Sequence, residues 1–400
     1  MKHAIFDELF VLELANNHLG DVDRGIRIVR EHARVVRANG VRAAIKLQLR
    51  DVDRFIHRDY RQRNDVRYIG KTLRTRLNRS QHGQIAKAIR ESGCLLAATP
   101  FDEASVDFCG NLRCDVVKVA SSDINDWPLI EAVAKLRLPT IASTGGSSLK
   151  DVDDLVAYFA NRGIPLALNH CVSIYPSEDR ELDINQVDFL RMRYPDNVVG
   201  FSTHEHTSWD ASIMLAYAKG ARTFERHIDI HEMTPDGKPI AKKRTDGLVD
   251  VTYPFIAYPI SPYCSTPTQV DYWFKAFKLA KEMCGGSRFH KRTPPAKEVE
   301  YLDSLVRGVW AKRDLPAGYV ISHAAVADDF YLAIPLLKGQ LSCRELLGGE
   351  VLSHPVPKDT PLMVDDVAGM DGPVADMMRG RGLEPSIHVR FVNSKKTVFN

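Results

Sequence analysis

Eight short apolar segments recur along the first part of the chain, and each contains a residue that can do chemistry at or near its end. They span residues 10–15, 43–48, 94–100, 116–121, 139–144, 164–171, 198–204 and 221–227. Apolar runs of this length are typical of strands buried on both faces, and the stretches between them are long enough for helices. Eight such units predict an α/β fold, a closed parallel (β/α)8 or TIM barrel.

The polar residues of these runs lie where the strands are expected to end, which is where enzymes with this fold place their active sites. Cationic and hydroxyl side chains suit a phosphate group, two histidines on neighbouring strands suit a divalent metal, and carboxylates can accept protons. A lysine inside a barrel is costly to bury without a partner, so a bound anion is expected there. The residues concerned are Glu13, Lys46, Lys118, Ser121, Ser143, Ser202, His204, Glu225 and His227.

The chain has 400 residues, more than the ~250 that one barrel needs, so a second domain is expected. A helix expected over 269–284 stops at Gly285-Gly286, which places the end of the barrel domain at residue 285. The charged segment 51–78 is interpreted either as a lid or substrate collar or as a solvated insertion. After the barrel domain (1–285) we expect a linker (286–302), a small β-rich domain (303–368) and a C-terminal tail (369–400).

Composition excludes several classes of protein. The net charge is only +3, and the basic residues alternate with acidic ones, so nucleic acid is not an expected partner. No apolar run approaches the ~20 residues of a membrane helix, and the N-terminus lacks a signal-peptide pattern. The seven cysteines are scattered and form no CxxC pair, which favours reduced thiols. We therefore expect a cytoplasmic protein without a membrane partner.

A series of motifs follows in a fixed order along residues 10–228. They are ELANNHLGD (13–21), IKLQ (45–48), ATPFDEASVDF (98–108), VVKVASSDINDWPLI (116–130), STGGSS (143–148), NHCVSIYPS (169–177), VGFSTHEHT (199–207) and FERHI (224–228). This order resembles the sialic acid synthase family, which condenses phosphoenolpyruvate with sugars. SLVRGVWAKRDLPAGYVIS (304–322) and KGQLSCRELLGG (338–349) resemble the family's SAF, or antifreeze-like, domain.

The resemblance implies a role for each matching residue. It implies that phosphoenolpyruvate is bound by Lys46, Lys118, Ser121, Ser143 and Ser202. It also implies that His204 and His227 are ligands of a divalent metal, with manganese expected first and magnesium or cobalt as alternatives. It places Glu13 at the acceptor sugar and Asp123 close to the condensation, with Asn17, His18, Gln48, Thr99 and Tyr175 shaping the mouth. Arg307 matches an arginine that a partner subunit inserts over the acceptor, which implies a homodimer that is domain-swapped through the SAF domain.

The chain departs from the family pattern at three places, all on the acceptor side. Thr203 replaces an aspartate, and Leu332-Ala333-Ile334-Pro335 replaces an Arg-Pro-Gly stretch. Beyond His227 the family's acceptor-contacting aspartate corresponds to Asp236, to Asp246 or to neither. The donor, phosphoenolpyruvate, is therefore better predicted than the acceptor. N-acetylmannosamine is the expected sugar aldehyde, with another amino or deoxy sugar as the alternative.

The predicted reaction is a metal-dependent condensation that gives a nonulosonic, 3-deoxy-2-ulosonic acid and phosphate. Two alternatives stay open: a metal-dependent hydrolase of the barrel type, and a non-catalytic carbohydrate-binding protein. The hydrolase is disfavoured because its HxH pattern is expected after the first strand, whereas HEH here follows the seventh. His206 is a candidate outer group of the metal site, His170 is as compatible with a structural role as with a functional one, and Cys171 is expected to be buried packing.

Overall fold

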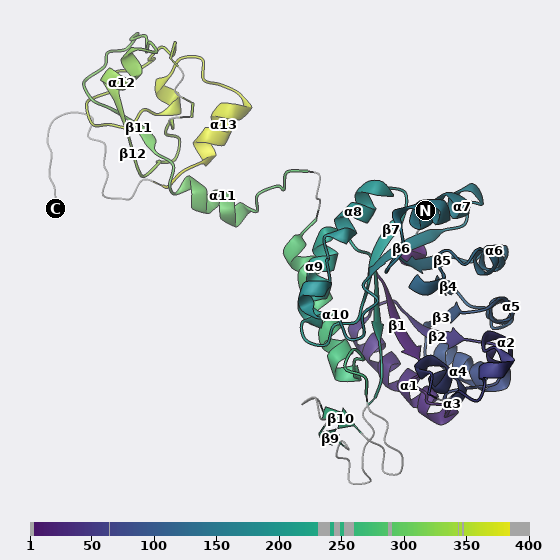
Figure 1. Cartoon of the computed structure of the whole chain (residues 1–400). Helices are drawn as coiled ribbons and strands as arrows, with labels where there is room; N and C mark the ends of the chain where they lie inside the picture. Colours follow the sequence, from purple (N-terminus) through teal and green to yellow (C-terminus); the bar gives the residue numbers. More distant parts are fainter. Residues whose placement is uncertain are drawn as a thin grey trace. The chain divides into compact units, whose positions relative to one another are not determined.

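The structure is a computed structural model, and it describes residues 4–63, 65–230, 241–243, 249–251, 260–286, 290–342, 344–345 and 348–384. The chain forms two compact units, Met1–Gly285 and Gly286–Asn400 (Figure 1). Each unit has its own hydrophobic core.

The first unit is a closed barrel of eight parallel strands in sequence order, as predicted. Each strand falls on one of the eight apolar runs, and neighbouring strands pair in parallel. The strands are β1 (Leu9–Ala15), β2 (Ala43–Leu49), β3 (Leu95–Pro100), β4 (Val116–Val119), β5 (Thr140–Ser143), β6 (Leu166–Cys171), β7 (Val198–Thr203) and β8 (Thr223–His227).

Helices surround the strands (Figure 1). They are α1 (Val22–Asn39), α4 (Arg79–Glu91), α5 (Glu103–Asn111), α6 (Trp127–Lys135), α7 (Leu149–Asn161), α8 (Gln186–Arg193), α9 (Trp209–Lys219) and α10 (Pro267–Cys284). Asp21 caps α1 by accepting hydrogen bonds from the backbone of Asp23 and Arg24. No helix in the described part of the chain is long and apolar enough to cross a membrane.

The barrel interior is apolar at one end and polar at the other. Side chains alternate along a strand, so residues two apart face the same way. Val11, Ala44 and Val116 precede Glu13, Lys46 and Lys118 by two positions. With Phe6, Leu9, Ala97, Ile141 and Ala167 they form a buried apolar layer. This layer fills the barrel below the polar residues, so the polar groups collect at the carboxyl ends of the strands.

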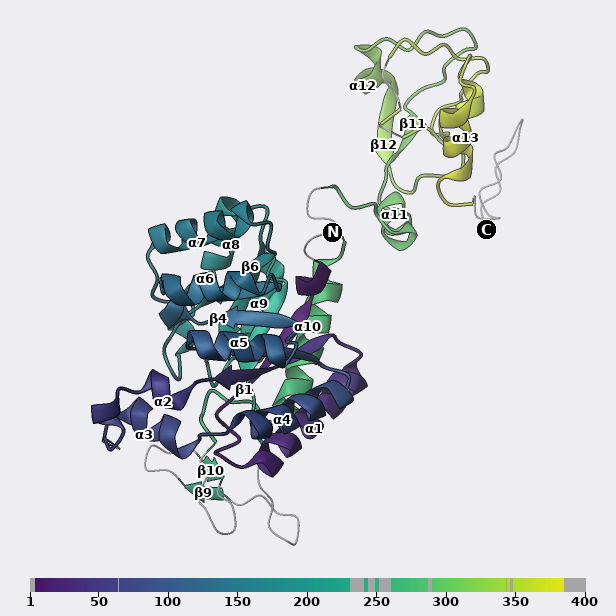
Figure 2. The same ribbon diagram turned by 90° about the vertical axis from the view of Figure 1, so that its right-hand side faces the viewer.

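The charged segment between β2 and α4 forms α2 (Val52–Phe55), a 3-10 turn η2 (Arg58–Tyr60) and α3 (Arg67–Arg74). It lies at the end of the barrel where strand β2 finishes (Figures 1 and 2). Gly20, in the β1–α1 turn, has a φ of +82°, and a Cβ there would lie 3.1 Å from the Arg74 carbonyl oxygen. The end of α3 therefore packs onto this turn at the mouth, as a collar would, whereas residues 53–55 and 57–63 are exposed, as in a solvated insertion.

Short elements complete the first unit. They are the 3-10 turns η1 (Ala4–Phe6), η3 (Ser121–Asp123) and η4 (Asp179–Glu181), and an antiparallel pair of β9 (Ala241–Lys243) and β10 (Val249–Val251).

The second unit has less strand than the sequence suggested. Its elements are α11 (Ala296–Asp303), β11 (Gly308–Ala311), α12 (Ala325–Asp329), β12 (Phe330–Ala333), η5 (Val364–Asp366) and α13 (Pro373–Gly380). β11 and β12 pair antiparallel, and the other expected runs contribute isolated bridges such as Val320–Val351. Helix α11 begins inside the expected linker and ends just beyond it, at Asp303. Helix α13 lies inside the expected tail, and its residues Ala375 and Met378 are buried in the core of this unit. The IHVRFV stretch of the tail lies outside the described residues.

Candidate active site

Two lysines and two glutamates form the floor of the barrel mouth. Lys46 Nζ is ion-paired with Glu13 and lies 3.3 Å from Glu225 Oε1, while Lys118 Nζ donates to Glu225 Oε2 at 2.8 Å. All four side chains are buried. The lysines are therefore already paired, and the expectation that their burial alone requires a bound anion is wrong. The glutamates balance their charge, so an arriving anion must compete with carboxylates.

The electrostatics of this floor are dominated by burial and by the lysines themselves. Burial, with Lys118 and Arg50 nearby, lowers the pKa of Lys46 to about 8 despite the opposing effect of Glu225. Burial alone would raise the pKa of Glu225, but Lys118 and Lys46 outweigh it and hold that pKa below its usual range. Glu225 is therefore a carboxylate at neutral pH, and it links both lysines.

Hydroxyl groups gather beside the floor. Thr99 Oγ1 accepts a hydrogen bond from Lys46 Nζ at 2.8 Å, and the Ser143 hydroxyl is buried without a partner among the described residues. A Cβ on Gly145 would lie 2.5 Å from Ser173 Oγ and 3.0 Å from Ser121 Oγ, so these two hydroxyls converge on the bare glycine backbone. Two hydroxyls that converge on Gly145, with the unpartnered Ser143 hydroxyl two residues earlier in the chain, suit a phosphate group.

Ser202 and Ser173 extend this group in different ways. Ser202, predicted from the sequence, is buried on β7 and pairs in register with Glu225. Ser173 was not predicted, although it stands inside the NHCVSIYPS motif, two residues before Tyr175. Ser173 is two residues after Cys171, so strand alternation would turn it to the same side. It lies beyond the end of β6, however, where alternation cannot be assumed.

His204 and His227 meet at the ends of β7 and β8, with ring centroids 5.4 Å apart. The Nδ1 atom of His204 contacts the Val172 carbonyl oxygen at 2.9 Å, which leaves its Nε2 as the acceptor. His227 Nδ1 is buried without a hydrogen-bond partner among the described residues. Burial lowers the pKa of His204 to about 4 and lowers that of His227 well below the usual value.

Two tyrosines cover this histidine pair. The Tyr175 ring lies 4.0 Å from the His204 ring, and the Tyr263 ring lies 5.1 Å from His227, measured between centroids. The tyrosines also contact each other edge to face at 5.2 Å. Tyr175 was predicted as a mouth residue. Tyr263 was not, because it lies beyond the last matching motif.

The histidine pair fits part of a divalent metal site. Neutral imidazoles are the form that binds metal, and the His204–Val172 contact is the kind of outer hydrogen bond that orients a ligating histidine. Within the described ranges, however, no group of three or more His, Cys, Asp or Glu side chains could hold an ion. Among the described residues, His204 and His227 are therefore the two candidate protein ligands here. His206 has a buried Nδ1 without a partner in the described residues, and it does not complete such a group.

Gln48, Arg50 and Asp123 lie higher in the mouth. Arg50 stacks on the Phe101 ring at 3.6 Å and donates to Gln48 Oε1 at 3.0 Å. Burial raises the pKa of Asp123, against a lowering effect of Arg50, and its Oδ2 is buried without a described partner. Arg50 was not predicted, although it continues the alternation of Lys46 and Gln48 along β2.

Several predicted residues serve the scaffold. Asn17 donates to the Ile228 carbonyl at 2.8 Å, and His18 Nδ1 accepts from Gly20 at 3.1 Å. His170 contacts the Leu182 carbonyl at 2.7 Å, which is a structural contact, and Cys171 is buried, as expected.

Three acceptor-side features identified in the sequence stay untested by the structure. The Thr203 hydroxyl is buried without a described partner. Asp236 and Asp246 lie outside the described residues, and Arg307 is exposed in the second unit.

Comparison with known proteins supports this architecture. Residues 35–241 match the NeuB family, and residues 306–368 match the SAF domain. A solved structure of a putative spore coat polysaccharide biosynthesis protein E from Chromobacterium violaceum is 32% identical, with a TM-score of 0.79 over 90% of this chain and 99% of that one. The N-acetylneuraminate-9-phosphate synthase of Drosophila melanogaster is 27% identical over 62% of this chain and 66% of its own. The Bacillus subtilis spore coat polysaccharide biosynthesis protein SpsE is 25% identical over 91% and 94%.

The fold and the mouth define a (β/α)8-barrel protein of the synthase type with an appended SAF domain. The chain belongs to the NeuB family. Relatives include N-acetylneuraminate-9-phosphate, N,N'-diacetyllegionaminic acid and pseudaminic acid synthases.

Proposed function

We propose that this protein condenses phosphoenolpyruvate with the open-chain aldehyde of a sugar, giving a nonulosonic acid and phosphate. The observation that carries the proposal is that one barrel mouth contains three features. They are the buried lysines Lys46 and Lys118, the serine hydroxyls that converge on Gly145, and the neutral pair His204 and His227. The names of the relatives support the product class.

The donor would bind at the floor. Its phosphate would take the hydroxyls around Gly145 and Ser143, while Lys46 and Lys118 would turn from their glutamate partners toward the donor's negative charges. C3 of the enol would then attack the aldehyde carbon, water would add at C2, and phosphate would leave with C–O cleavage. The two lysines would stabilise the negative charge throughout.

The carboxylates would handle protons near the reacting atoms. Glu13 lies on β1 beside Lys46, and once that lysine faces the donor, Glu13 is free to accept a proton from the acceptor or from water. Asp123, whose pKa is raised by burial, is suited to give or take a proton at the opposite side.

A divalent ion, manganese in the first instance, would be held by His204 and His227 and would supply a Lewis acid for the aldehyde. Tyr175 and Tyr263 would exclude water from that side. The acceptor would be N-acetylmannosamine or a related amino or deoxy sugar. The decisive assay measures phosphate release from phosphoenolpyruvate with manganese and a panel of aldoses; no release with any acylamino or deoxy aldose would overturn the proposal.

We also propose a homodimer in which Arg307 reaches the partner's mouth. Arg307 is exposed, and in the described residues it makes no ion pair. Mixing Arg307→Ala subunits with Lys118→Met subunits tests this arrangement. Recovery of activity after proven subunit exchange supports action in trans, because one site then carries both lesions and the other carries none. A mixture as inactive as its parents rejects it.

A further inference from the structure

Arg226 lies on β8 between Glu225 and His227, and strand alternation turns it away from the barrel interior. The side chain is fully buried between the strands and the helices. Its Nη2 donates to the Glu205 carbonyl oxygen at 2.8 Å, its Nη1 lies 3.3 Å from Glu205 Oε1, and its Nε donates to the Ser265 hydroxyl.

These three contacts join the two candidate metal ligands from behind. Glu205 directly follows His204, so Arg226 holds the backbone at the end of β7. Ser265 donates its backbone N–H to the His227 carbonyl at 2.8 Å and forms a β-bridge with Ile228. One guanidinium therefore connects the chain next to His204 with the segment that pairs beside His227.

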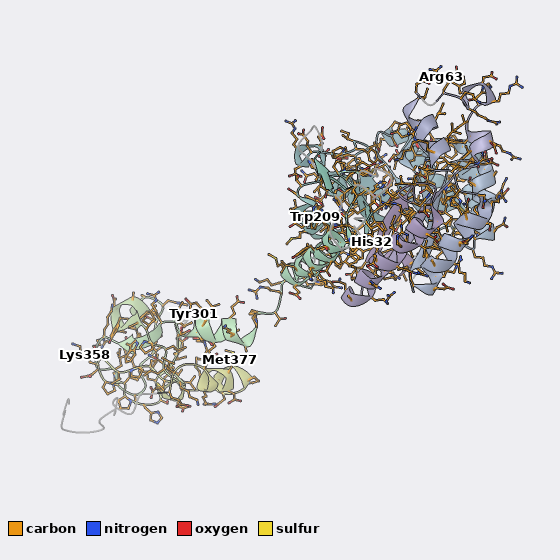
Figure 3. The ribbon with its side chains drawn as sticks, turned by 90° about the horizontal axis from the view of Figure 1, so that it is seen from below. His32, Arg63, Trp209, Tyr301, Lys358 and Met377 are labelled. Carbon is orange, nitrogen blue, oxygen red and sulfur yellow. The ribbon has the colours of Figure 1, made fainter. Side chains whose placement is uncertain are left out.

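Neighbouring helices fix this connection in place. Ser212 of α9 donates to the Glu205 carboxylate, and the ring of Trp209 lies 5.8 Å from the Arg226 guanidinium. His32 of α1 contacts the Ser265 carbonyl at 3.3 Å. Trp209 and His32 are labelled in Figure 3, in the barrel unit.

The two histidines depend on this network to different degrees. His204 has a side-chain contact of its own, to Val172, that orients its ring. His227 Nδ1 has none within the described part of the chain, so the position of its ring follows from the backbone that Ser265 and Arg226 hold.

We propose that Arg226 is a positioning residue for the metal site, whose guanidinium sets the spacing of His204 and His227 from outside the barrel. The inference rests on the proposed metal-dependent function. Arg226 itself contacts neither substrate nor metal. If the inference holds, the Arg226–Glu205 ion pair affects metal affinity as well as stability.

The test uses Co²⁺ as the only probe, on the full-length protein freed of metal. Titration calorimetry gives its affinity, and its visible absorption spectrum reports the coordination geometry. Arg226→Met is compared with Arg24→Met, a matched control. Arg24 also forms a buried ion pair, with Asp229 at 2.7 Å, and its Nε donates to the Asn17 carbonyl oxygen at 2.7 Å, so it ties Asp229 to the turn after β1 instead of to the end of β7.

Both variants should lose thermal stability, because each removes the arginine from a buried ion pair and leaves the carboxylate's charge uncompensated. Only Arg226→Met should bind Co²⁺ at least tenfold more weakly and with an altered spectrum, and Arg226→Lys should recover part of the affinity. Glu205→Gln keeps the carbonyl contact and should change the affinity less than Arg226→Met does.

A folded Arg226→Met protein with the wild-type affinity and spectrum would overturn the inference, as would an equal loss in Arg24→Met. If Arg226→Met does not fold, Arg226→Lys decides by the same criteria. Wild-type protein that binds no Co²⁺ would instead remove the metal premise, which separates failure of the proposed function from failure of the positioning role.

Discussion

The two parts of the mouth differ in how their polar side chains are paired. One part is the floor of lysines and glutamates, and the other is the pair His204 and His227. At the floor, Lys46 and Lys118 are neutralised by Glu13 and Glu225. At the end of β7 and β8, uncharged imidazoles are held by scaffold contacts, and one ring nitrogen has no partner in the described residues. The floor must therefore exchange partners when an anion binds, whereas the histidine pair is organised in advance. The floor is thus a site that rearranges on binding, and the histidine pair is a preformed site.

Substitutions in the histidine pair should cause the largest loss of turnover. His204→Ala and His227→Ala each remove one of the two proposed metal ligands, and loss of a Lewis acid costs several kcal/mol, or about a thousandfold in turnover. Metal content by mass spectrometry and folding by circular dichroism should be measured on the same samples. Unchanged metal stoichiometry in both folded variants would contradict the assignment.

Removing one lysine from the floor should lower both the stability of the protein and its affinity for phosphoenolpyruvate. Lys118→Met should lower the free energy of unfolding by about 3 kcal/mol, at the low end for a broken buried pair, because Lys46 still faces Glu225. Donor binding by calorimetry should weaken as well. Adding Glu225→Gln should restore stability without restoring affinity, since the orphaned carboxylate is removed but the cation is still missing. Restored donor binding in the double variant would place Lys118 outside the donor site.

The same floor should respond to acid. The lysines hold the pKa of Glu225 below the unfolded value, so its carboxylate stabilises the fold above about pH 4.5 and loses that contribution as the pH falls toward about 2. The difference in unfolding free energy between wild type and Glu225→Gln should shrink by about 2–3 kcal/mol across that range. Urea titrations at each pH measure it, and a difference that is independent of pH would show that Glu225 is not held as an anion.

The smallest effect is expected at the hydroxyls that converge on Gly145. A methyl group at Gly145 would lie 2.5 Å from Ser173 Oγ and would push the converging hydroxyls apart. Gly145→Ala should weaken phosphoenolpyruvate binding about tenfold, near 1.4 kcal/mol, with little change in metal binding. Gly146→Ala, where a Cβ meets nothing within 4 Å but φ is +71°, controls for backbone strain. Equal weakening in both variants would argue against a phosphate site there.

The sequence predicted the barrel well because each strand is a continuous apolar run, and alternation then fixed which residues face inward. Glu13, Lys46 and Lys118 were identified as polar residues near the ends of these runs. Pairing between strands distant in the sequence was not readable, so the neutralisation of the lysines by Glu225 was missed. Arg50, Ser173 and Tyr263 were missed because they stand beyond strand ends or motifs. The second unit was predicted less well, since its short strands and bridges leave little periodicity.

The apolar layer beneath the floor has a kinetic consequence. Phe6, Leu9 and Val11 help to fill the barrel end opposite the mouth, so both substrates must enter by one opening. The proposed donor site would lie at the bottom of that opening, below the histidine pair and its tyrosines. An acceptor that arrives first would stand in the donor's path. Steady-state measurements should therefore show an ordered mechanism in which phosphoenolpyruvate is the leading substrate, and a dead-end acceptor analogue should be uncompetitive toward it.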